Sequence, residues 1–157
     1  MGGTWPCDFA EVEHEVYCIA HFIAGGTIGT VLPGPISAAC TGLVSHAVLD
    51  AVPHSEYTNH WWGALDVIAT CALALAVLAA GADARAIAGG LGGALPDLEV
   101  AAAYLFPRAF RPHGRLRLLF PSHSGLVRHR RLAFPWGVFT QAAVIFALGA
   151  LVSLWGR

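Results

Sequence analysis

The stretch Ser45-His46-Ala47-Val48-Leu49-Asp50-Ala51-Val52-Pro53-His54 places two imidazoles and one carboxylate inside an otherwise apolar segment. On a helix, His46 and Asp50 lie four residues apart and therefore share one face. Pro53 ends or kinks such a helix, and His54 follows directly after it. Imidazole and carboxylate groups at a spacing fixed by a helix are suitable ligands for divalent zinc, manganese or iron. The stretch therefore predicts a metal site.

The composition around this stretch is that of a membrane protein. Of 157 residues, 56% are hydrophobic, only 12% are charged and none is lysine, and the mean hydropathy is +0.61. A soluble domain carries roughly 25% charged residues, about twice this share. We therefore predict a single all-α membrane domain over residues 1–157, built as an integral membrane helical bundle.

Five hydrophobic segments are predicted to form this bundle, some of them short or broken. Residues 16–32 lie near the short limit of roughly 17 residues for a membrane crossing. Within them, Gly25 and Gly29 form a small-xxx-small pair, which lets another helix approach closely. The remaining segments are 36–53, 61–82, 86–106 and 132–155.

The charged residues are unevenly distributed along the chain. An acidic N-terminal cap, residues 1–15, holds four of the ten acids, whereas the loop 107–131 holds seven of the nine arginines. Such a loop indicates the cytoplasmic side, either as a topology signal alone or also through contact with anionic lipid head groups. Five crossings then put the end of the second segment, the second half of the fourth and His21 on that side. The loop has no recognisable nucleic-acid-binding module, so no nucleic-acid partner is expected.

Ionisable residues at membrane depth are costly and normally face the interior of the bundle. A single one is explained by a helix–helix hydrogen bond, but several carboxylates and histidines on one side require a shared cation or many mutual protons. In Pro96-Asp97-Leu98-Glu99 the proline bends the chain, so the two carboxylates need not lie on opposite faces. The residues concerned are His21, His46, Asp50, Asp66, Asp97 and Glu99.

The basic loop contains Pro121-Ser122-His123-Ser124-Gly125, which supplies one more candidate ligand. His123 offers an imidazole to the metal, and the Ser124 hydroxyl can orient a substrate oxygen. Arg128 and Arg130 can hold a phosphate through charge-assisted, often bidentate hydrogen bonds. A solvated loop with incidental histidines is the alternative interpretation.

Three motifs resemble those of small bacterial inner-membrane proteins known as membrane-bound metal-dependent hydrolases: Ser45-His46-x-x-x-Asp50, Gly93-Ala94-Leu95-Pro96-Asp97-x-Glu99 and His123-Ser124. His21 followed by Gly25-Gly26 fits the same pattern. The resemblance covers most of residues 21–129, although the second motif usually precedes the first and Glu99 replaces an aspartate. The first motif with Pro53-His54 is also similar to the zinc-binding helix of bacterial phospholipase C and the single-strand nucleases.

The resemblance implies a multi-pass protein of the bacterial inner membrane that hydrolyses a phosphoester or lipid-like substrate at the cytoplasmic face. One or two divalent ions, zinc first and manganese or iron as alternatives, would lower the pKa of a bound water. Glu99 or His54 would act as general base. The predicted metal ligands are His21, His46, Asp50, Asp97 and His123, and the predicted substrate contacts are Arg128, Arg130 and Ser124.

Two other functions are consistent with the sequence. The small size and the glycine-rich faces also suit a non-catalytic structural or accessory subunit of a larger membrane complex, with lipids and other membrane proteins as partners. Intramembrane carboxylates are also typical of proton or metal-ion pathways. That third hypothesis is the weakest, because the sequence shows no inverted repeat and no second polar cluster near the outer face.

Overall fold

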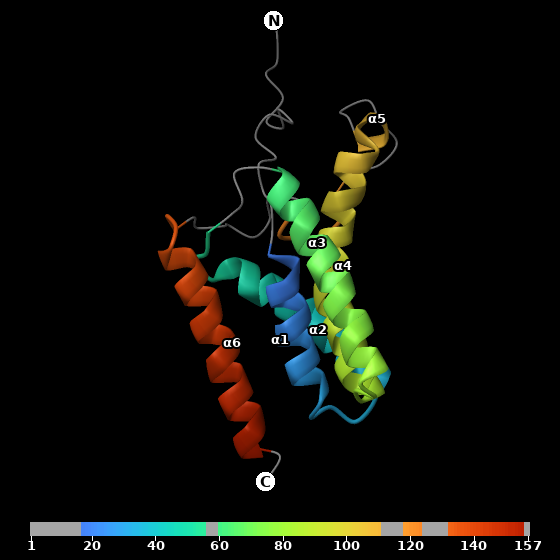
Figure 1. Cartoon of the computed structure of the whole chain (residues 1–157), viewed down its shortest axis with the longest axis vertical. Helices are drawn as coiled ribbons and strands as arrows, with labels where there is room; N and C mark the ends of the chain where they lie inside the picture. The colour runs from blue at the N-terminus through green and yellow to red at the C-terminus, as the bar shows by residue number, and fades with distance from the viewer. Residues whose placement is uncertain (1–16, 56–59, 111–117, 124–131, 156–157) are drawn as a thin grey trace, which may run out of the picture.

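The computed structural model describes residues 17–55, 60–110, 118–123 and 132–155, and within them the chain is all-helical, without strands. This confirms the predicted all-α class. The helices are α1 (Cys18–Gly29), α2 (Pro35–Ala51), α3 (His60–Ala79), α4 (Ala84–Leu105), α5 (Pro107–Phe110) and α6 (Trp136–Trp155) (Figure 1).

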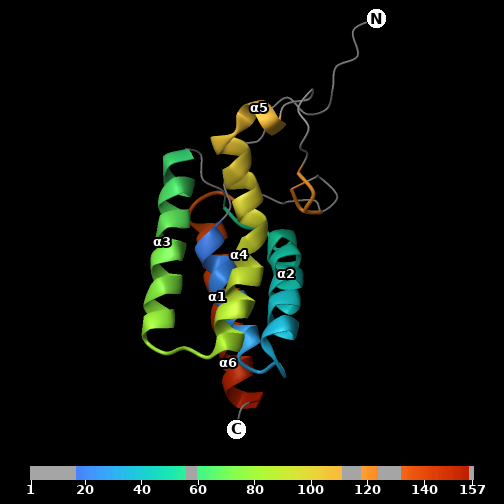
Figure 2. The same ribbon diagram turned by 90° about the vertical axis from the view of Figure 1, so that its right-hand side faces the viewer.

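Each of the five predicted hydrophobic segments contains one long helix, and the short helix α5 inside the arginine-rich loop was not predicted. The long helices alternate in direction. α1, α3 and α6 begin at the end of the molecule where α5 lies, whereas α2 and α4 begin at the opposite end (Figures 1 and 2). The alternation brings the start of α1, the end of α2 and the second half of α4 to the same end.

The helix boundaries follow from local chemistry. Gly34 caps α2, where the Ser37 hydroxyl accepts a hydrogen bond from the Gly34 amide at 3.2 Å, and Pro35 occupies the first turn. The α2 helix ends at Ala51, because a residue that precedes a proline is disfavoured in the helical region.

Asp83 caps α4 by accepting a hydrogen bond from the backbone amide of Arg85 at 2.8 Å. The Arg85 guanidinium also donates to the Asp83 carboxylate and holds the pKa of Asp83 well below its usual value, at about 2. The same guanidinium donates a further hydrogen bond, from Arg85 Nη1 to the Leu32 carbonyl at 3.0 Å. The start of α4 is therefore tied to the turn between α1 and α2.

The inner unit of the fold consists of α1, α2 and α4, which pack together through glycines. A Cβ atom added at Gly25 or Gly42 would overlap the backbone of Gly89 on α4, and one added at Gly29 would overlap the backbone of Arg85. The predicted close approach at Gly25 and Gly29 is therefore confirmed. Close contact between helix backbones replaces the large apolar side chains of an ordinary core.

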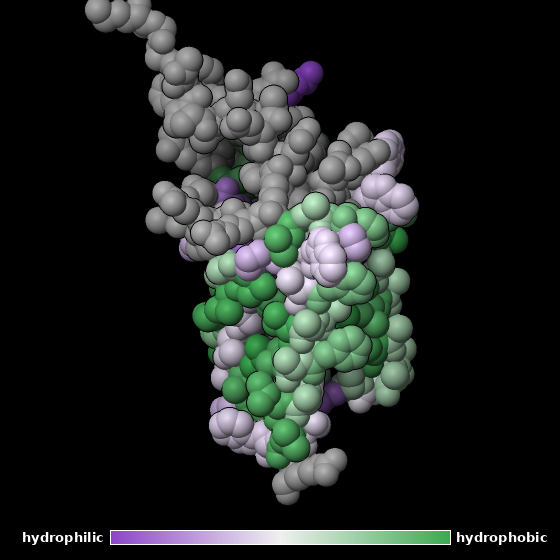
Figure 3. Space-filling model, turned by 90° about the vertical axis from the view of Figure 1, so that its left-hand side faces the viewer, coloured by the Kyte–Doolittle hydropathy of each residue, from purple (hydrophilic) through white to green (hydrophobic). Residues whose placement is uncertain are grey.

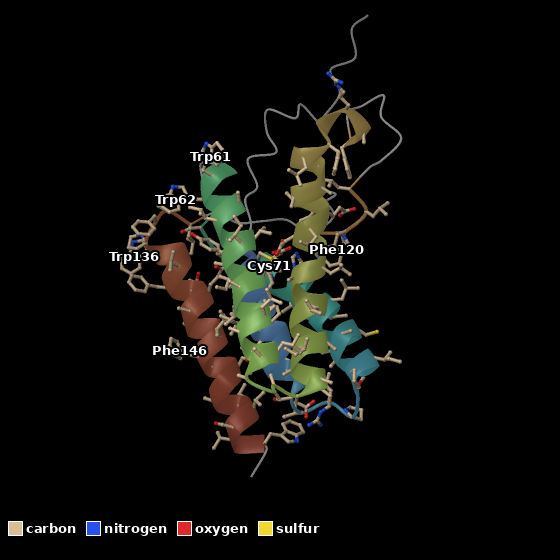
Figure 4. The ribbon with its side chains drawn as sticks, turned by 45° about the vertical axis from the view of Figure 1, so that its right-hand side comes forward. Trp61, Trp62, Cys71, Phe120, Trp136 and Phe146 are labelled. Carbon is tan, nitrogen blue, oxygen red and sulfur yellow. The ribbon has the colours of Figure 1, made fainter. Side chains whose placement is uncertain are left out.

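The two outer helices, α3 and α6, expose many of their apolar side chains, while Val67, Leu73 and Val77 of α3 pack against the core. Trp61–Ala79 and Trp136–Trp155 are long and apolar enough to cross a membrane, yet only 11% of each of these segments is buried. Leu75 is 67% exposed and Phe146 is 78% exposed. Figure 3 shows such hydrophobic residues over much of one face, and Figure 4 shows Trp61, Trp62 and Trp136 at the starts of the two helices.

Five membrane crossings are not confirmed. In the described part of the chain, only α3 and α6 meet the length and hydropathy expected of a span. The α1 helix has 12 residues and so is roughly 18 Å long, well short of a hydrocarbon core of about 30 Å. The α2 and α4 helices do not meet the same criteria.

Candidate metal centre

The five predicted metal ligands converge from four separate segments of the chain. His21 comes from the first turns of α1, His46 and Asp50 from the end of α2, Asp97 from α4, and His123 from the segment 118–123. The side chains of His21, His46 and Asp50 are 0% exposed, that of Asp97 is 4% exposed and that of His123 is 3% exposed. A buried polar cluster of this size requires mutual neutralisation.

Asp50 lies between two histidines. One carboxylate oxygen, Oδ1, lies 3.2 Å from His21 Nε2, and the other, Oδ2, lies 3.1 Å from His46 Nε2. The rings of His21 and His46 stack with their centroids 3.9 Å apart. The predicted pairing of His46 and Asp50 on one helix face is therefore present, and a second helix contributes to it.

The other half of the cluster is centred on His46. Its Nε2 atom lies 3.7 Å from Asp97 Oδ1 and 3.4 Å from His123 Nε2. His123 Nε2 in turn lies 3.9 Å from Asp97 Oδ1 and 4.0 Å from Asp50 Oδ2. Within the described residues, two triplets have ligand atoms close enough to share an ion: His21, His46 and Asp50, and His46, Asp97 and His123.

These separations fit a metal shell. A tetrahedral ion with bonds of about 2.0–2.2 Å separates its ligand atoms by roughly 3.3–3.6 Å. The four atoms His46 Nε2, His123 Nε2, Asp50 Oδ2 and Asp97 Oδ1 are 3.1–4.0 Å apart in the pairs given above. His21 contacts the other Asp50 oxygen, Oδ1, and forms the first triplet with His46 and Asp50.

The tautomer of His46 is determined by its other nitrogen. Nδ1 lies 2.7 Å from the backbone carbonyl of Gly93, which can only accept a hydrogen bond, so Nδ1 carries the proton. The Nε2 lone pair therefore points into the cluster, as a metal ligand requires. Phe120 closes one side, with its ring edge-on to His46 at a centroid distance of 5.0 Å.

Glu99, a predicted general base, lies behind His123. Its Oε2 atom is 3.8 Å from His123 Nδ1, the ring nitrogen that does not face the other ligands. The same carboxylate accepts hydrogen bonds from the backbone amides of Leu119 and Phe120. Such a carboxylate orients a ligating histidine. These contacts are those expected of a positioning residue, and the role of Glu99 as general base stays a prediction.

His54, the other predicted base, is buried on the connection that follows α2 and belongs to neither triplet. Its Nδ1 donates to the Val52 carbonyl at 2.7 Å, and its own carbonyl accepts from the Leu132 amide at 2.8 Å. His54 thus helps to fix the approach to α6. The predicted substrate-binding residues Ser124, Arg128 and Arg130 lie outside the described residues.

The contacts of three residues could not be read from the sequence. Gly93 was quoted only as the start of the Pro-Asp motif, although its carbonyl orients His46. Ser122 was passed over in favour of Ser124, yet its buried hydroxyl has no hydrogen-bond partner among the residues described. Asp66 accepts a hydrogen bond from the Ile19 amide at 3.4 Å, so it caps α1 from α3. No local pattern could have shown this contact, since its partners are 47 residues apart.

No protein-family model, curated protein or solved structure matches the chain. The case for a metal centre therefore depends on the geometry above.

Proposed function

We propose that the chain is a membrane-embedded, metal-dependent hydrolase that acts on a phosphoester or lipid-like substrate at the cytoplasmic face of the bacterial inner membrane. The observation that carries the proposal is the convergence of buried imidazole and carboxylate groups from α1, α2, α4 and the segment 118–123. Uncompensated charges in a low-dielectric interior are strongly destabilising, and a divalent cation compensates them.

The residues divide into ligands and supports. His46, Asp50, Asp97 and His123 would hold the ion, while His21 and Glu99 would position Asp50 and His123. A bound divalent ion supplies a water of lowered pKa and neutralises the developing charge of a phosphoester. The identity of the ion decides whether a water and a substrate can bind to it as well. Manganese and iron accept six ligands and would keep coordination positions open.

The membrane placement is supported by the outer surface. Within the described residues only 11% of each of the outer helices α3 and α6 is buried, although part of α3 packs against the core, and an exposed apolar surface of this extent is suited to lipid. The tryptophans at the starts of α3 and α6 lie at one end, as interfacial tryptophans do (Figure 4). The arginine-rich loop 107–131 contains α5, which lies at the same end (Figure 1) and would mark the cytoplasmic side.

A structural or accessory subunit is the second candidate, and one specific observation favours it. Four protein ligands complete a tetrahedral zinc shell, and closed shells of this kind are typical of structural sites. The hydrolase and the structural subunit therefore predict different metals and different behaviour on loading.

Metal analysis of detergent-purified protein is the first test, with wild type measured beside His46→Ala. We expect about one tightly bound divalent ion per chain in the wild type and its loss in the variant. The same preparation, loaded with manganese, iron or zinc in turn, is then assayed with bis(p-nitrophenyl) phosphate. Wild type without a stoichiometric ion removes the basis of the hydrolase. A bound ion without turnover under any loading favours the structural subunit.

A further inference from the structure

An open pocket of about 430 Å³ lies between α2 and α4 and is bordered by the segment 118–123. We call it the leucine groove. Its lining includes Leu43, Leu95, Leu98, Leu119 and Phe120, together with one charged residue, Glu99. We propose that this groove binds the hydrocarbon chain of an anionic lipid whose head group lies at the metal centre. The inference rests on the proposed function and names its class of substrate.

The groove and the metal centre share residues. Phe120 lines the groove and also contacts His46, with ring centroids 5.0 Å apart, and His123, with centroids 5.7 Å apart. Glu99 lines the groove while its carboxylate lies 3.8 Å from His123. The groove and the metal centre are therefore adjacent, and Phe120 and Glu99 form the boundary between them.

The chemistry of the lining selects a hydrocarbon. Its large side chains are aliphatic or aromatic except for Glu99, so water gains few hydrogen bonds there and displacing it is favourable. The groove also opens onto the outer apolar surface, since its own lining residues Leu95, Leu98 and Leu119 are 56%, 45% and 85% exposed. A chain from the surrounding bilayer can enter along this surface without passing through water.

Among the described residues of the lining the only charge, the Glu99 carboxylate, repels an anion, so the selection of the head group depends on the metal ion. A divalent cation held by the centre attracts a phosphate anion, and a phosphoester that carries an acyl chain satisfies both ends of the site. A small water-soluble phosphoester would engage the ion but leave the leucines without a partner. An anionic phospholipid is thus the ligand that fits the centre and the groove together.

Photo-crosslinking tests the inference on the full-length, metal-loaded protein in phosphatidylcholine nanodiscs. The probe is phosphatidic acid with a diazirine in its acyl chain, and the sites of attachment are mapped by mass spectrometry. We expect labelling to concentrate on residues 43, 95–98 and 119–120. Unlabelled phosphatidic acid should compete with the probe, whereas glycerol phosphate, which lacks the chain, should not.

A matched pair of variants separates the groove from ordinary lipid contact. Leu98→Trp fills the groove, while Leu91→Trp changes a residue of similar exposure on the same helix outside the lining. Each methylene excluded from the groove should weaken binding roughly fourfold. Leu98→Trp should therefore reduce labelling of residues 119–120 several-fold, and Leu91→Trp should leave it unchanged.

Metal content measured on the same samples keeps the two proposals apart. Labelling that is equal on the groove and on α6, and insensitive to Leu98→Trp, overturns the groove even when the ion is bound. Wild type without an ion is a failure of the proposed function. Groove labelling in such metal-free protein also overturns the inference, because the head group would then have no cation to meet.

Discussion

The inner unit of α1, α2 and α4 and the outer pair of α3 and α6 distribute their side chains in opposite ways. The inner unit buries His21, His46, Asp50 and Asp97 and places glycines where its helices meet. On α6, leucines, valines and aromatic rings are exposed, and only Gly137 and Gln141 are buried. A water-soluble domain shows the reverse pattern. The comparison teaches that close backbone packing, rather than an apolar core, holds the polar cluster.

The glycines are what make the cluster geometrically possible. His21 and Asp50 belong to different helices, yet their side chains meet at 3.2 Å. His46 reaches the carbonyl of Gly93 at 2.7 Å across the α2–α4 contact. Both contacts require the helix axes to lie close together. Side chains larger than the hydrogen of glycine would keep the axes too far apart. The close packing at small residues therefore allows the polar side chains to meet.

Gly89→Val should have the largest effect, because it breaks this packing at its centre. A side chain at Gly89 would overlap the backbone of Gly25 on α1, and overpacking costs about 1–3 kcal/mol or more, the most where the neighbour is backbone that has to move. We expect loss of the folded protein, or an unfolding temperature many degrees lower, measured by intrinsic tryptophan fluorescence in detergent. Gly149→Val on α6 is the control, since nothing lies within 4 Å of a Cβ there. Equal unfolding temperatures for the two variants would contradict the comparison.

Asp50→Asn should abolish metal binding while leaving most of the fold intact. The substitution keeps the shape of the side chain but removes a charge that contacts both His21 and His46. Loss of an outer support typically weakens metal affinity 10–100-fold, so loss of a direct ligand should exceed roughly 100-fold. Competition with a fluorescent chelator measures the affinity.

The same substitution at Asp66 sharpens the contrast between the two regions. Asp66 is also a buried carboxylate, but it accepts a hydrogen bond from the Ile19 amide rather than joining the cluster. Asp66→Asn should retain the ion and lower stability by about 1 kcal/mol or less, as a weakened helix cap does. If Asp66→Asn lost the ion as completely as Asp50→Asn, the assignment of ligands would be wrong.

His21→Gln should have an intermediate effect, because His21 contacts Asp50 Oδ1, whereas His46 contacts Oδ2. Glutamine can still donate to that oxygen, so we expect affinity to fall roughly 10–100-fold without being lost. The visible spectrum of the Co²⁺-substituted protein distinguishes support from ligation. An unchanged spectrum indicates that His21 positions Asp50, and a new coordination geometry would show that His21 binds the ion itself.

The helices and the residues of the cluster could be predicted from the sequence. The sequence could not show which of these residues would bind the ion and which would position a ligand. The four-residue spacing of His46 and Asp50 and the cost of burying ionisable groups were sufficient to select the candidates. The role of His21 could not be predicted, because it depends on which Asp50 oxygen it meets across two helices. The five spans predicted from hydropathy are not confirmed: α1 has only 12 residues and ends before the turn at Pro33-Gly34-Pro35.

The junction between the outer helix α3 and the inner helix α4 should show the smallest effect. Arg85 holds the pKa of Asp83 at about 2 through hydrogen bonds to the carboxylate. A carboxyl whose pKa is lowered on folding stabilises the protein above its unfolded pKa, and this contribution is lost as the pH falls towards 2.

Asp83→Asn keeps a good helix cap but removes the titrating charge. The difference in unfolding temperature between wild type and variant should therefore shrink as the pH falls from about 5 to about 2. It should also stay small throughout, since the pair is exposed to solvent and screened by salt. A large difference in unfolding temperature that grew towards low pH would show that this junction belongs to the tightly coupled inner unit. The inner unit would then have to be redefined to include the junction.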